Sequence, residues 1–414
     1  VSWTRNEAGN LSYIGRLNYS YADKYLFEFL VRSQASTKFS PDNYWGAFPS
    51  VSAGWVMSEE KWFPKESTKI DYLKIRASAG IMGRDNVDAW RWLQLYSYNE
   101  YGGAIFGTDV TQLTGRSFQL PEKSGTNPDL RWDKNYKTNF GIDLRMLDNR
   151  LSVSLDGYYD FGREMFAYPG AINLPGTVGI YAAPENYSEM DMYGLELIVG
   201  WRQRINNDMY FSVRGGFAWD DNKVKKYYWD NPLEFDSYRP NQRTDRGLWG
   251  LSCMGMFRSY QEIEEYFDKY KITDYLGLSQ DKVHPGMLIY EDIRGKRDEE
   301  TGQYSPIPDG VISAQDDVVQ ISKRQSNPYK TNLNLNFVYK SFSLNATLTA
   351  EWGAYTLMPG ELRGEKFSDM EKQNVSTMWN DMFIYEDVLD AQGNVIAQAN
   401  PDGRWPNFGF TSGN

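Results

Sequence analysis

The chain has 414 residues, a formal net charge of -11, one cysteine (Cys253) and one histidine (His284). The negative charge argues against nucleic-acid binding, which needs clustered lysine and arginine to neutralise phosphates. A single cysteine cannot form an internal disulfide, and together with one histidine it offers too few ligands for a Cys/His zinc site. Because His284 precedes Pro285-Gly286, it is interpreted as a loop histidine rather than the base of a Ser-His-Asp site.

Alternation of apolar and polar residues with a period of two recurs along the chain. This period predicts β-strands that have one apolar face and one polar face. In chain order the alternating runs are residues 11–21, 25–34, 51–57, 73–79, 136–146, 151–161, 195–202, 209–220, 331–339 and 342–352.

The last two runs show the pattern most clearly. Leucine and phenylalanine alternate with asparagine from Thr331 to Tyr339, and a tight turn at Lys340-Ser341 leads into a second alternating run that ends at Trp352. Each run has about ten residues or more, roughly what a tilted strand needs to cross a bilayer. An apolar stripe that ends in tyrosine or tryptophan, opposite a polar stripe, indicates lipid on one side and water on the other.

The connections between these runs alternate between short and long. Tight turns are predicted at 22–24, 148–149, 206–208 and 340–341, and residues 59–70 form one longer exception. The long segments are 38–48, 84–127, 167–189, 222–326 and the residues from 358 onward. This asymmetry is typical of an outer-membrane barrel with short periplasmic turns and long extracellular loops. We therefore expect residues 1–414 to be part of one barrel domain, with 222–326 as a long extracellular loop region.

Hydropathy is compatible with this interpretation. The chain has no run of about eighteen apolar residues, so no transmembrane helix is expected. A mean hydropathy of -0.62 is usual for soluble proteins, but half of each barrel strand is polar and the loops are wet. Aromatic residues make up 16% of the chain, enough for girdles at both membrane interfaces. About ten strands would leave two edges unpaired in lipid, so we expect closing strands from residues outside this sequence.

An ordered series of motifs resembles the SusC/RagA family of TonB-dependent outer-membrane transporters from Bacteroidetes. Residues 45–55 resemble that family's WGxFPSxSxGW segment, and 73–80 continue it. The series goes on with NPDLRW at 127–132, NFGID at 139–143, NRL at 149–151 and DGYYD at 156–160. Residues 194–197 are similar to its GxExxL strand, and 255–257 with 261–263 to its GIFQSQEEI segment. The order and spacing match over most of the chain.

The resemblance implies an all-β fold, a transmembrane antiparallel β-barrel of about 22 strands with a plugged lumen. This chain would supply roughly ten strands from its middle and later part, without the plug, the first strands or the last ones. The implied function is TonB-dependent import of an oligosaccharide or a peptide together with a SusD-like surface lipoprotein. TonB would act through the absent plug, and the assembly would be a dimer of transporter-lipoprotein pairs. We expect no catalytic residue, no metal site, no cofactor and no enzyme activity.

One acidic stretch departs from the family pattern. Family members often carry DxNGDGxI after a PGxxxYxD segment, whereas here only Asp309-Gly310 and Asp316-Asp317 remain after an expanded 294–307. A calcium loop needs several oxygen ligands at close spacing. A solvated turn is therefore favoured over a calcium site.

Aromatic residues in the long loops are the candidate contacts for a substrate or partner. Tyrosine and tryptophan faces stack on sugar rings and anchor protein interfaces. The alternative is that they pack the loops together or sit at the membrane interface. The candidates are Trp90, Trp92, Tyr96, Tyr98, Tyr228, Trp229 and Trp249.

Polar residues on the predicted inner face are expected to contact a plug or to hold water, and none is named as a substrate residue: Arg16, Arg32, Arg76, Lys137, Arg145, Arg202, Arg214, Asn332, Asn334 and Asn336. Two other functions stay open at this level. One is a passive porin or adhesin barrel without a plug, and the other is a soluble glycan-binding β-protein.

Overall fold

The computed structural model describes residues 9–94, 96–103, 115–119, 125–169, 182–228, 240–298, 301–357 and 381–406. The chain divides into two compact units. The first, called the sheet unit, comprises Val1–Pro232, Ser237–Thr244 and Asn327–Gly353. The second unit comprises Leu233–Asp236, Asp245–Ser326 and Ala354–Asn414.

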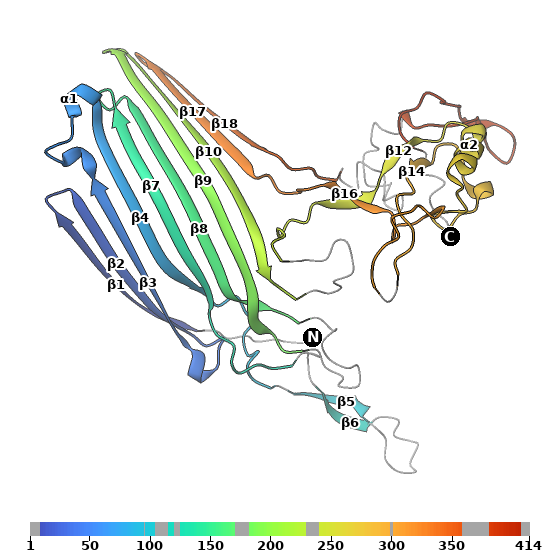
Figure 1. The fold of residues 1–414 in the computed structure, drawn as a ribbon, viewed down its shortest axis with the longest axis horizontal. Coiled ribbons are helices and arrows are strands. Elements are labelled where there is room, and N and C mark those ends of the chain that lie inside the picture. Colours follow the sequence, from blue (N-terminus) through green and yellow to red (C-terminus); the bar gives the residue numbers. More distant parts are fainter. Residues whose placement is uncertain are drawn as a thin grey trace. The chain divides into compact units, whose positions relative to one another are not determined.

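One antiparallel sheet of ten strands makes up most of the sheet unit (Figure 1). Each strand pairs with the next strand of the sheet along the chain, so the sheet is a meander. In order the strands are β1 (Asn10–Tyr21), β2 (Tyr25–Ser36), β3 (Trp45–Val56), β4 (Ile70–Arg84), β7 (Asp133–Met146), β8 (Leu151–Ala167), β9 (Glu185–Asn206), β10 (Met209–Lys226), β17 (Tyr329–Tyr339) and β18 (Phe342–Trp352). All ten alternating runs of the sequence are strands of this sheet, which confirms the all-β antiparallel prediction.

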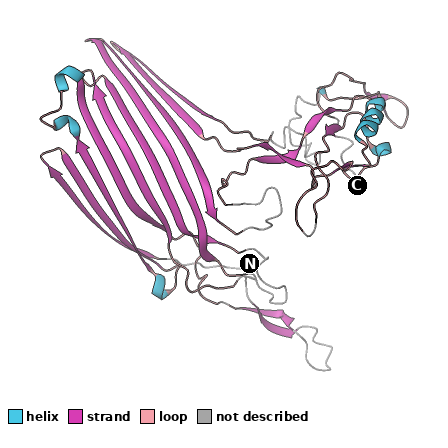
Figure 2. Ribbon diagram, in the orientation of Figure 1, coloured by secondary structure: helices cyan, strands magenta, loops and turns pink. Residues whose placement is uncertain are grey.

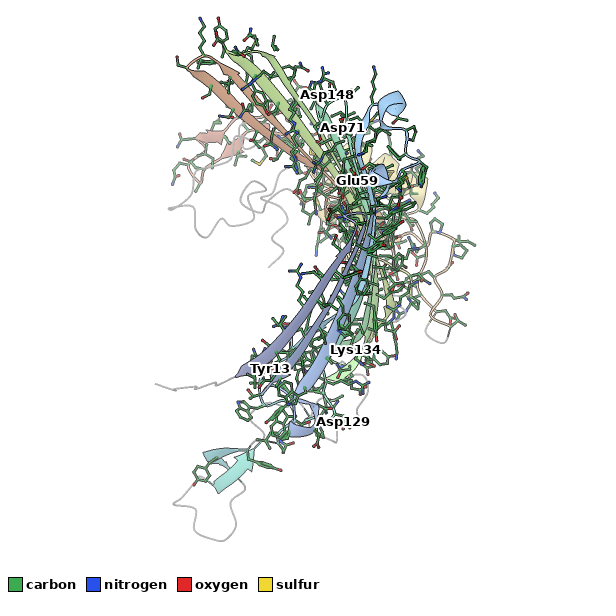
Figure 3. The ribbon with its side chains drawn as sticks, turned by 90° about the vertical axis from the view of Figure 1, so that its left-hand side faces the viewer. Tyr13, Glu59, Asp71, Asp129, Lys134 and Asp148 are labelled. Carbon is green, nitrogen blue, oxygen red and sulfur yellow. The ribbon has the colours of Figure 1, made fainter. Side chains whose placement is uncertain are left out.

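The short and long connections separate to the two rims of the sheet, as predicted. Tight turns join β1 to β2, β7 to β8, β9 to β10 and β17 to β18. The exception between β3 and β4 contains η2 (Met57–Glu59) and the single turn α1 (Lys65–Thr68). Figure 3 shows Glu59, Asp71 and Asp148 together at this rim, where Asp71 accepts a hydrogen bond from the Asn149 amide at 2.7 Å. The other rim carries η1 (Pro41–Asn43) and a separate hairpin of β5 (Ser97–Gly103) and β6 (Gly115–Gln119).

Three of the predicted long segments are shorter than the sequence suggested, and in the first of them, 38–48, β3 already begins at Trp45. β9 already begins at Glu185, inside the expected segment 167–189, and β10 continues to Lys226, inside 222–326. The ladder between them continues past the apolar stripe, with Lys223 opposite Asp191 and Val224 opposite Met190. The prediction was wrong there because it followed apolar alternation, whereas the strands continue on backbone pairing alone.

The register places apolar and polar side chains on opposite faces of the sheet. One row across β8, β9 and β10 is Leu155, Leu197 and Phe217, and the adjacent row on the other face is Asp156, Glu196 and Ala218. Successive side chains of a strand point to opposite faces, so these assignments extend along the whole ladder. The sheet therefore has one apolar surface and one polar surface.

Aromatic rings border the apolar surface near both rims. Toward the long-connection rim, Tyr193 lies between Tyr159 and Trp219, with ring centroids 5.6 Å and 5.8 Å away. Toward the tight-turn rim, Tyr21 stacks on Tyr25 at 6.3 Å. Tyrosine and tryptophan combine an apolar ring with a polar end, which suits the level of lipid headgroups. The distance between the two borders thus marks the band that lipid covers.

A small core closes the long-connection rim of the sheet. Phe39, Phe48 and Leu130 are buried around Trp132, whose ring lies 5.2 Å from Phe39 and from Phe48. The Trp132 indole donates to the Tyr44 carbonyl at 3.1 Å. The WGxFPSxSxGW and NPDLRW segments therefore meet in one packed cluster, which gives these motifs a structural role.

The second unit has a core of its own, and Figure 2 shows its helices in cyan and its short strands in magenta. Its strands pair in twos: β11 (Leu248–Leu251) with β16 (Val318–Ser322), β12 (Cys253–Met256) with β14 (Leu288–Tyr290), β13 (Asp274–Tyr275) with β15 (Val311–Ile312), and β19 (Val388–Leu389) with β20 (Val395–Ala397). A 3-10 turn, η5, spans Gln280–Lys282. The core residues are Phe257, Ile263, Tyr266, Phe267, Ile272, Tyr275, Val283 and Ile312.

One amphipathic helix, α2 (Tyr260–Tyr270), contributes the largest share of that core. Ile263, Tyr266 and Phe267 recur at helical spacing and are buried. Ser259 caps the N-terminus by accepting from the Glu262 amide at 3.2 Å, and Lys271 ends the helix in a left-handed conformation. Residues 245–326, which the sequence predicts to lie in a long loop region, thus belong to a packed unit. Their location outside the membrane stays a prediction.

Candidate functional site

The polar face of the sheet carries an ion-pair network centred on Arg76. The Arg76 guanidinium donates to Asp143 at 3.0 Å and to Asp156 at 2.6 Å, and Ser154 donates to Asp143 at 2.7 Å. Arg76 is on β4 and Asp156 on β8, so the side chain must cross β7. It does so over Gly141, where a Cβ atom would lie 2.6 Å from the guanidinium carbon and 2.8 Å from an Asp156 oxygen. A glycine on β7 is therefore what lets this bridge span three strands.

A second side chain crosses its neighbouring strand over a glycine. It lies in the next register row on this face, nearer the rim that carries the long connections. The Tyr158 ring of β8 extends over β9 at Gly194, where a Cβ atom would lie 2.6 Å from both the hydroxyl oxygen and the ring carbon that carries it. Only a residue without a side chain leaves room for the ring at this place. The register row through it contains Ser78, Asn139, Tyr158, Gly194 and Asp220, one residue from each of five strands.

A hollow of about 520 Å³ opens at this row. Ion pairs border it: Lys137 binds Asp160 at 2.9 Å, and Lys330 binds Asp220 at 3.2 Å. Glu196 is exposed, and within the described part of the chain its side chain has no hydrogen bond or ion pair. The residues around the hollow are Ser78, Lys137, Thr138, Asn139, Tyr158, Asp160, Met192, Glu196, Asp220, Asp221 and Asn222.

A second hollow of about 550 Å³ lies toward β1. Its polar lining includes Glu28, Lys74 and Arg76, and Glu28 is paired with Arg16. Lys74 lies over Gly54, where a Cβ atom would be 2.8 Å from its Cε. The polar residues that the sequence assigned to the inner face all occupy polar-face positions in the strand register.

The candidate aromatic residues of the loop after β4 are partly exposed. Trp90 and Trp92 lie with ring centroids 6.2 Å apart, and Trp90 has a left-handed backbone. Tyr96 and Tyr98 are 67% and 53% exposed. The structure brings the two tryptophans together, and a role for any of the four in binding stays a prediction.

Two of the remaining aromatic candidates have structural partners. Tyr228 stacks on Tyr187 at 4.0 Å and donates to Glu185 at 3.0 Å. Burial, followed by that carboxylate, raises the pKa of Tyr228 to about 12. Trp249 belongs to the second unit, where its indole donates to the Arg246 carbonyl at 2.9 Å. Trp229 lies outside the described residues.

The acidic stretch at 309–317 forms turns that its own carboxylates hold together. Asp309 accepts from the Val311 amide at 3.0 Å and is exposed. The prediction of a solvated turn is wrong for Asp317, which is 0% exposed. Both its oxygens accept backbone hydrogen bonds, from Ile293 at 2.9 Å and from Ser313 at 2.9 Å. Among the residues that the structure describes, no group of three acidic, histidine or cysteine side chains is arranged to hold a metal ion.

None of the described helices is long and apolar enough to span a membrane.

Known proteins resemble this chain both in sequence and in fold. No family model matches the chain. The TonB-dependent receptor SusC of Bacteroides thetaiotaomicron is 33% identical over 226 residues, which are 54% of this chain and 21% of the relative. A TonB-dependent receptor of Formosa agariphila is 28% identical over 363 residues, which are 85% of this chain and 33% of the relative. These likenesses are consistent with a piece of a SusC/RagA-family TonB-dependent receptor.

The fold of this chain is similar to that of solved outer-membrane importers. The RagAB peptide importer in its closed-closed state superposes with a TM-score of 0.64 over 96% of this chain and 38% of the other, at 19% identity. Its open-open state gives a TM-score of 0.65 over 97% of this chain. At this identity the likeness concerns the fold.

The chain spans about a sixth to a third of the length of the curated relatives it matches. Its sheet is part of an antiparallel β-barrel in the bacterial outer membrane. The apolar face is therefore the lipid side and the polar face the lumen side. That location excludes the soluble glycan-binding protein considered from the sequence.

Proposed function

We propose that the full-length protein imports an oligosaccharide or a peptide across the outer membrane, driven by TonB. The observation that carries this proposal is a lipid-facing sheet whose other face is lined by ion pairs and hollows, in a chain similar to SusC/RagA-family receptors. A polar inner wall gives water and hydrophilic solutes a path that lipid does not offer. The curated relatives are named as TonB-dependent receptors, and the solved relative as a peptide importer.

We further propose that a SusD-like lipoprotein covers the extracellular rim. Supporting this, the rim opposite the tight turns carries long segments with exposed aromatic side chains, including Tyr96 and Tyr98. Large rigid rings of this kind supply much of the energy in protein and sugar recognition. A lipoprotein above the rim would capture the substrate and release it into the lumen, and two such pairs would form a dimer.

The protein is proposed to transport its substrate without changing it. Several carboxylates on the polar face are bound to arginine or lysine, as in the pairs of Arg76 with Asp143 and Lys137 with Asp160. Such pairing keeps carboxylates ionised and leaves them poorly suited to proton transfer. The relatives are named as receptors and importers, none as an enzyme.

The test is isolation of the full-length protein from detergent-solubilised outer membranes, followed by mass spectrometry of what accompanies it. A co-purifying SusD-like lipoprotein, together with uptake that stops when TonB is deleted, is the expected result. A barrel that purifies alone and passes solutes without TonB would instead be a passive porin. Absence of the protein from the membrane fraction would overturn the proposal altogether.

A further inference from the structure

A third hollow, of about 590 Å³, lies on the apolar face of the sheet and is called the lipid-side hollow. Large apolar side chains surround it: Phe29, Pro49, Val51, Ile81, Tyr136 and Phe161. Its polar lining residues are Ser50, Lys137, Thr138 and Arg163. Alternation turns Ser50 and Lys137 toward the polar face, where Lys137 binds Asp160. Among these described lining residues, Arg163 is therefore the one charged side chain on the lipid side.

The lipid-side hollow exists because a small residue lies between larger ones. Phe29, Val51, Ala79 and Thr138 form one register row across β2, β3, β4 and β7, and Ala79 fills its place with a methyl group alone. Within the described residues, the ladder between β3 and β4 ends at Ser50 opposite Gly80. The next residue of β3, Pro49, has no N–H with which to continue it. Backbone pairing between these two strands therefore stops at the hollow.

The lipid-side hollow lies at the level of the lipid headgroups. Its row through Ala79 and Thr138 continues to Tyr159 of β8, which stacks on Tyr193 in the aromatic border near the long-connection rim. Arg163 lies further along β8 toward that rim, about 13 Å beyond Tyr159 at the rise of an extended strand. Because tyrosine rings mark the boundary between hydrocarbon and headgroups, the hollow reaches from the apolar to the polar side of this boundary.

Toward the bilayer centre the apolar face continues the same shape. The next row places Ala53 and Ala77 between Phe27 and Phe140. The two phenylalanines are 42% and 53% exposed, so their rings border the two alanines on the lipid side. An acyl chain that enters the lipid-side hollow from the bilayer can lie over these alanines.

Arg163, at the polar end of the hollow, keeps part of its guanidinium available. Its Nη1 donates to the Gly162 carbonyl and to Asp191, both at 2.8 Å, and its Nε lies 3.6 Å from Glu189. Within the part of the chain that the structure describes, Nη2 makes no hydrogen bond. Phosphate oxygens bind well to a guanidinium with open donors, because its planar fork matches their geometry.

Arg163 belongs to a cluster with more cations than carboxylates. Lys134 lies directly opposite Arg163 on the ladder, and Figure 3 shows Lys134 near the rim away from Asp148. Two carboxylates of the cluster each bind two cations: Glu164 binds Arg131 at 3.1 Å and Lys134 at 2.9 Å, and Asp191 binds Arg163 at 2.8 Å and Lys225 at 3.6 Å. With Glu189 as the third carboxylate for these four cations, the cluster keeps a net positive charge.

We propose that the lipid-side hollow binds an anionic, phosphate-bearing lipid of the outer leaflet, with an acyl chain over Ala79 and the phosphate on Arg163. The rim of long connections faces the cell exterior in outer-membrane barrels, which places the hollow in the outer leaflet. A lipid without net charge would fill the apolar part and leave the positive cluster unmatched. Anionic headgroups are attracted to such basic sites at the membrane surface.

The test measures lipid binding to the full-length protein, purified in a neutral detergent, by native mass spectrometry. The probes are dioleoyl phosphatidic acid and dioleoylglycerol, which has the same acyl chains without the phosphate; equimolar inorganic phosphate is added as a competitor. Arg163→Gln removes the charge, and Ala79→Phe fills the hollow. The matched controls are Arg16→Gln, at an ion-paired arginine of the polar face, and Ala350→Phe, at an exposed alanine of the apolar face of β18.

The expected result is one tightly bound phosphatidic acid for each barrel. Its dissociation constant should rise about tenfold in Arg163→Gln and in Ala79→Phe and stay unchanged in both controls. Arg163→Gln removes one partner of the buried Asp191, so Ala79→Phe, at an exposed position, provides the test if that variant assembles poorly.

Three results would overturn the proposal. Equal affinity for phosphatidic acid in the wild type and both hollow variants would exclude the site. Equal binding of dioleoylglycerol would exclude an anionic headgroup, and displacement of the lipid by equimolar inorganic phosphate would indicate a site for the free ion. A dimer mass without bound lipid would mean that a second copy of the chain covers the hollow, and would exclude the lipid as well.

Discussion

The two units of this chain are stabilised in opposite ways. In the sheet unit the large apolar side chains are on the outside: Leu335, Leu344 and Leu348 remain exposed on their face of the sheet. In the second unit they are inside, where Phe257 and Tyr275 are fully buried around α2. The two units therefore turn these apolar side chains toward different surroundings.

This difference shows what each unit needs in order to fold. The second unit buries its apolar surface within itself, so water is sufficient to drive its packing. The sheet unit satisfies its backbone through the ladder and leaves its apolar face for lipid, so its stability depends on the bilayer. Substitutions should therefore act locally, and the same chemical change should have different costs in the two units.

The largest effect is expected in the core of the second unit. Phe257→Ala should lower its free energy of unfolding by about 3–5 kcal/mol, because the removed ring is fully buried and leaves a cavity. Limited proteolysis of the full-length protein would show faster cleavage within 245–326, while the heat-modified mobility of the barrel on gels stays unchanged. Ile307→Ala is the control, since Ile307 is 71% exposed. Loss of the barrel in Phe257→Ala would contradict the independence of the units.

The next effect compares the two faces of one strand. Leu197 lies midway between Tyr193 and Trp201 on the lipid side, so Leu197→Arg should destabilise the barrel by about 2–4 kcal/mol. Ile198, the next residue, is on the lumen side, and Ile198→Arg should change the stability little. Unfolding of the full-length protein in lipid vesicles with denaturant would measure both. Equal costs would mean that the faces have been assigned wrongly.

A smaller effect is expected where a side chain crosses a strand. Gly141→Ala places a methyl group against the Arg76 guanidinium and Asp156, which should cost about 1–3 kcal/mol through displaced contacts. Gly157→Ala, on β8, is the control because no atom lies within 4 Å of its added Cβ. The denaturant midpoint in vesicles should fall for Gly141→Ala alone. If the midpoint fell equally in Gly141→Ala and Gly157→Ala, the cause would be strand propensity and not the ion pair of Arg76 with Asp156.

The smallest effect is a response of the second unit to acid. Partial burial alone would raise the pKa of Asp245, but hydrogen bonds from Ser326, Gly247 and Gln325 outweigh it and hold the pKa below its ordinary value. A lowered pKa stabilises the fold above the unfolded value of about 4, and this contribution is lost as the pH falls through the folded value. Proteolysis near 245 and 326 should thus increase below about pH 4. Asp245→Asn should be cleaved faster than the wild type at neutral pH, and its rate of cleavage should increase less as the pH falls.

The alternation of residues determined the ten strands, their faces and the rim at which each turn lies. Alternation of apolar and polar residues with a period of two fits only a β-strand when lipid lies on one side. The sequence alone therefore shows that Leu333 and Asn334 lie on opposite faces. The helical spacing of Ile263, Tyr266 and Phe267 in α2 can likewise be read from the sequence. These features depend on residues that are close together along the chain, so their pattern is visible in the sequence.

Tertiary structure decided what depends on partners far along the chain. The continuation of β9 and β10 past their apolar stripe, the burial of Asp317 by amides of Ile293 and Ser313, and the core of the second unit all rest on such pairings. The hollow at Tyr158 is of the same kind, because the emptiness above Gly194 matters only once the register brings that tyrosine beside it. Alternation fixes the face on which a residue lies, whereas register fixes which side chains meet there.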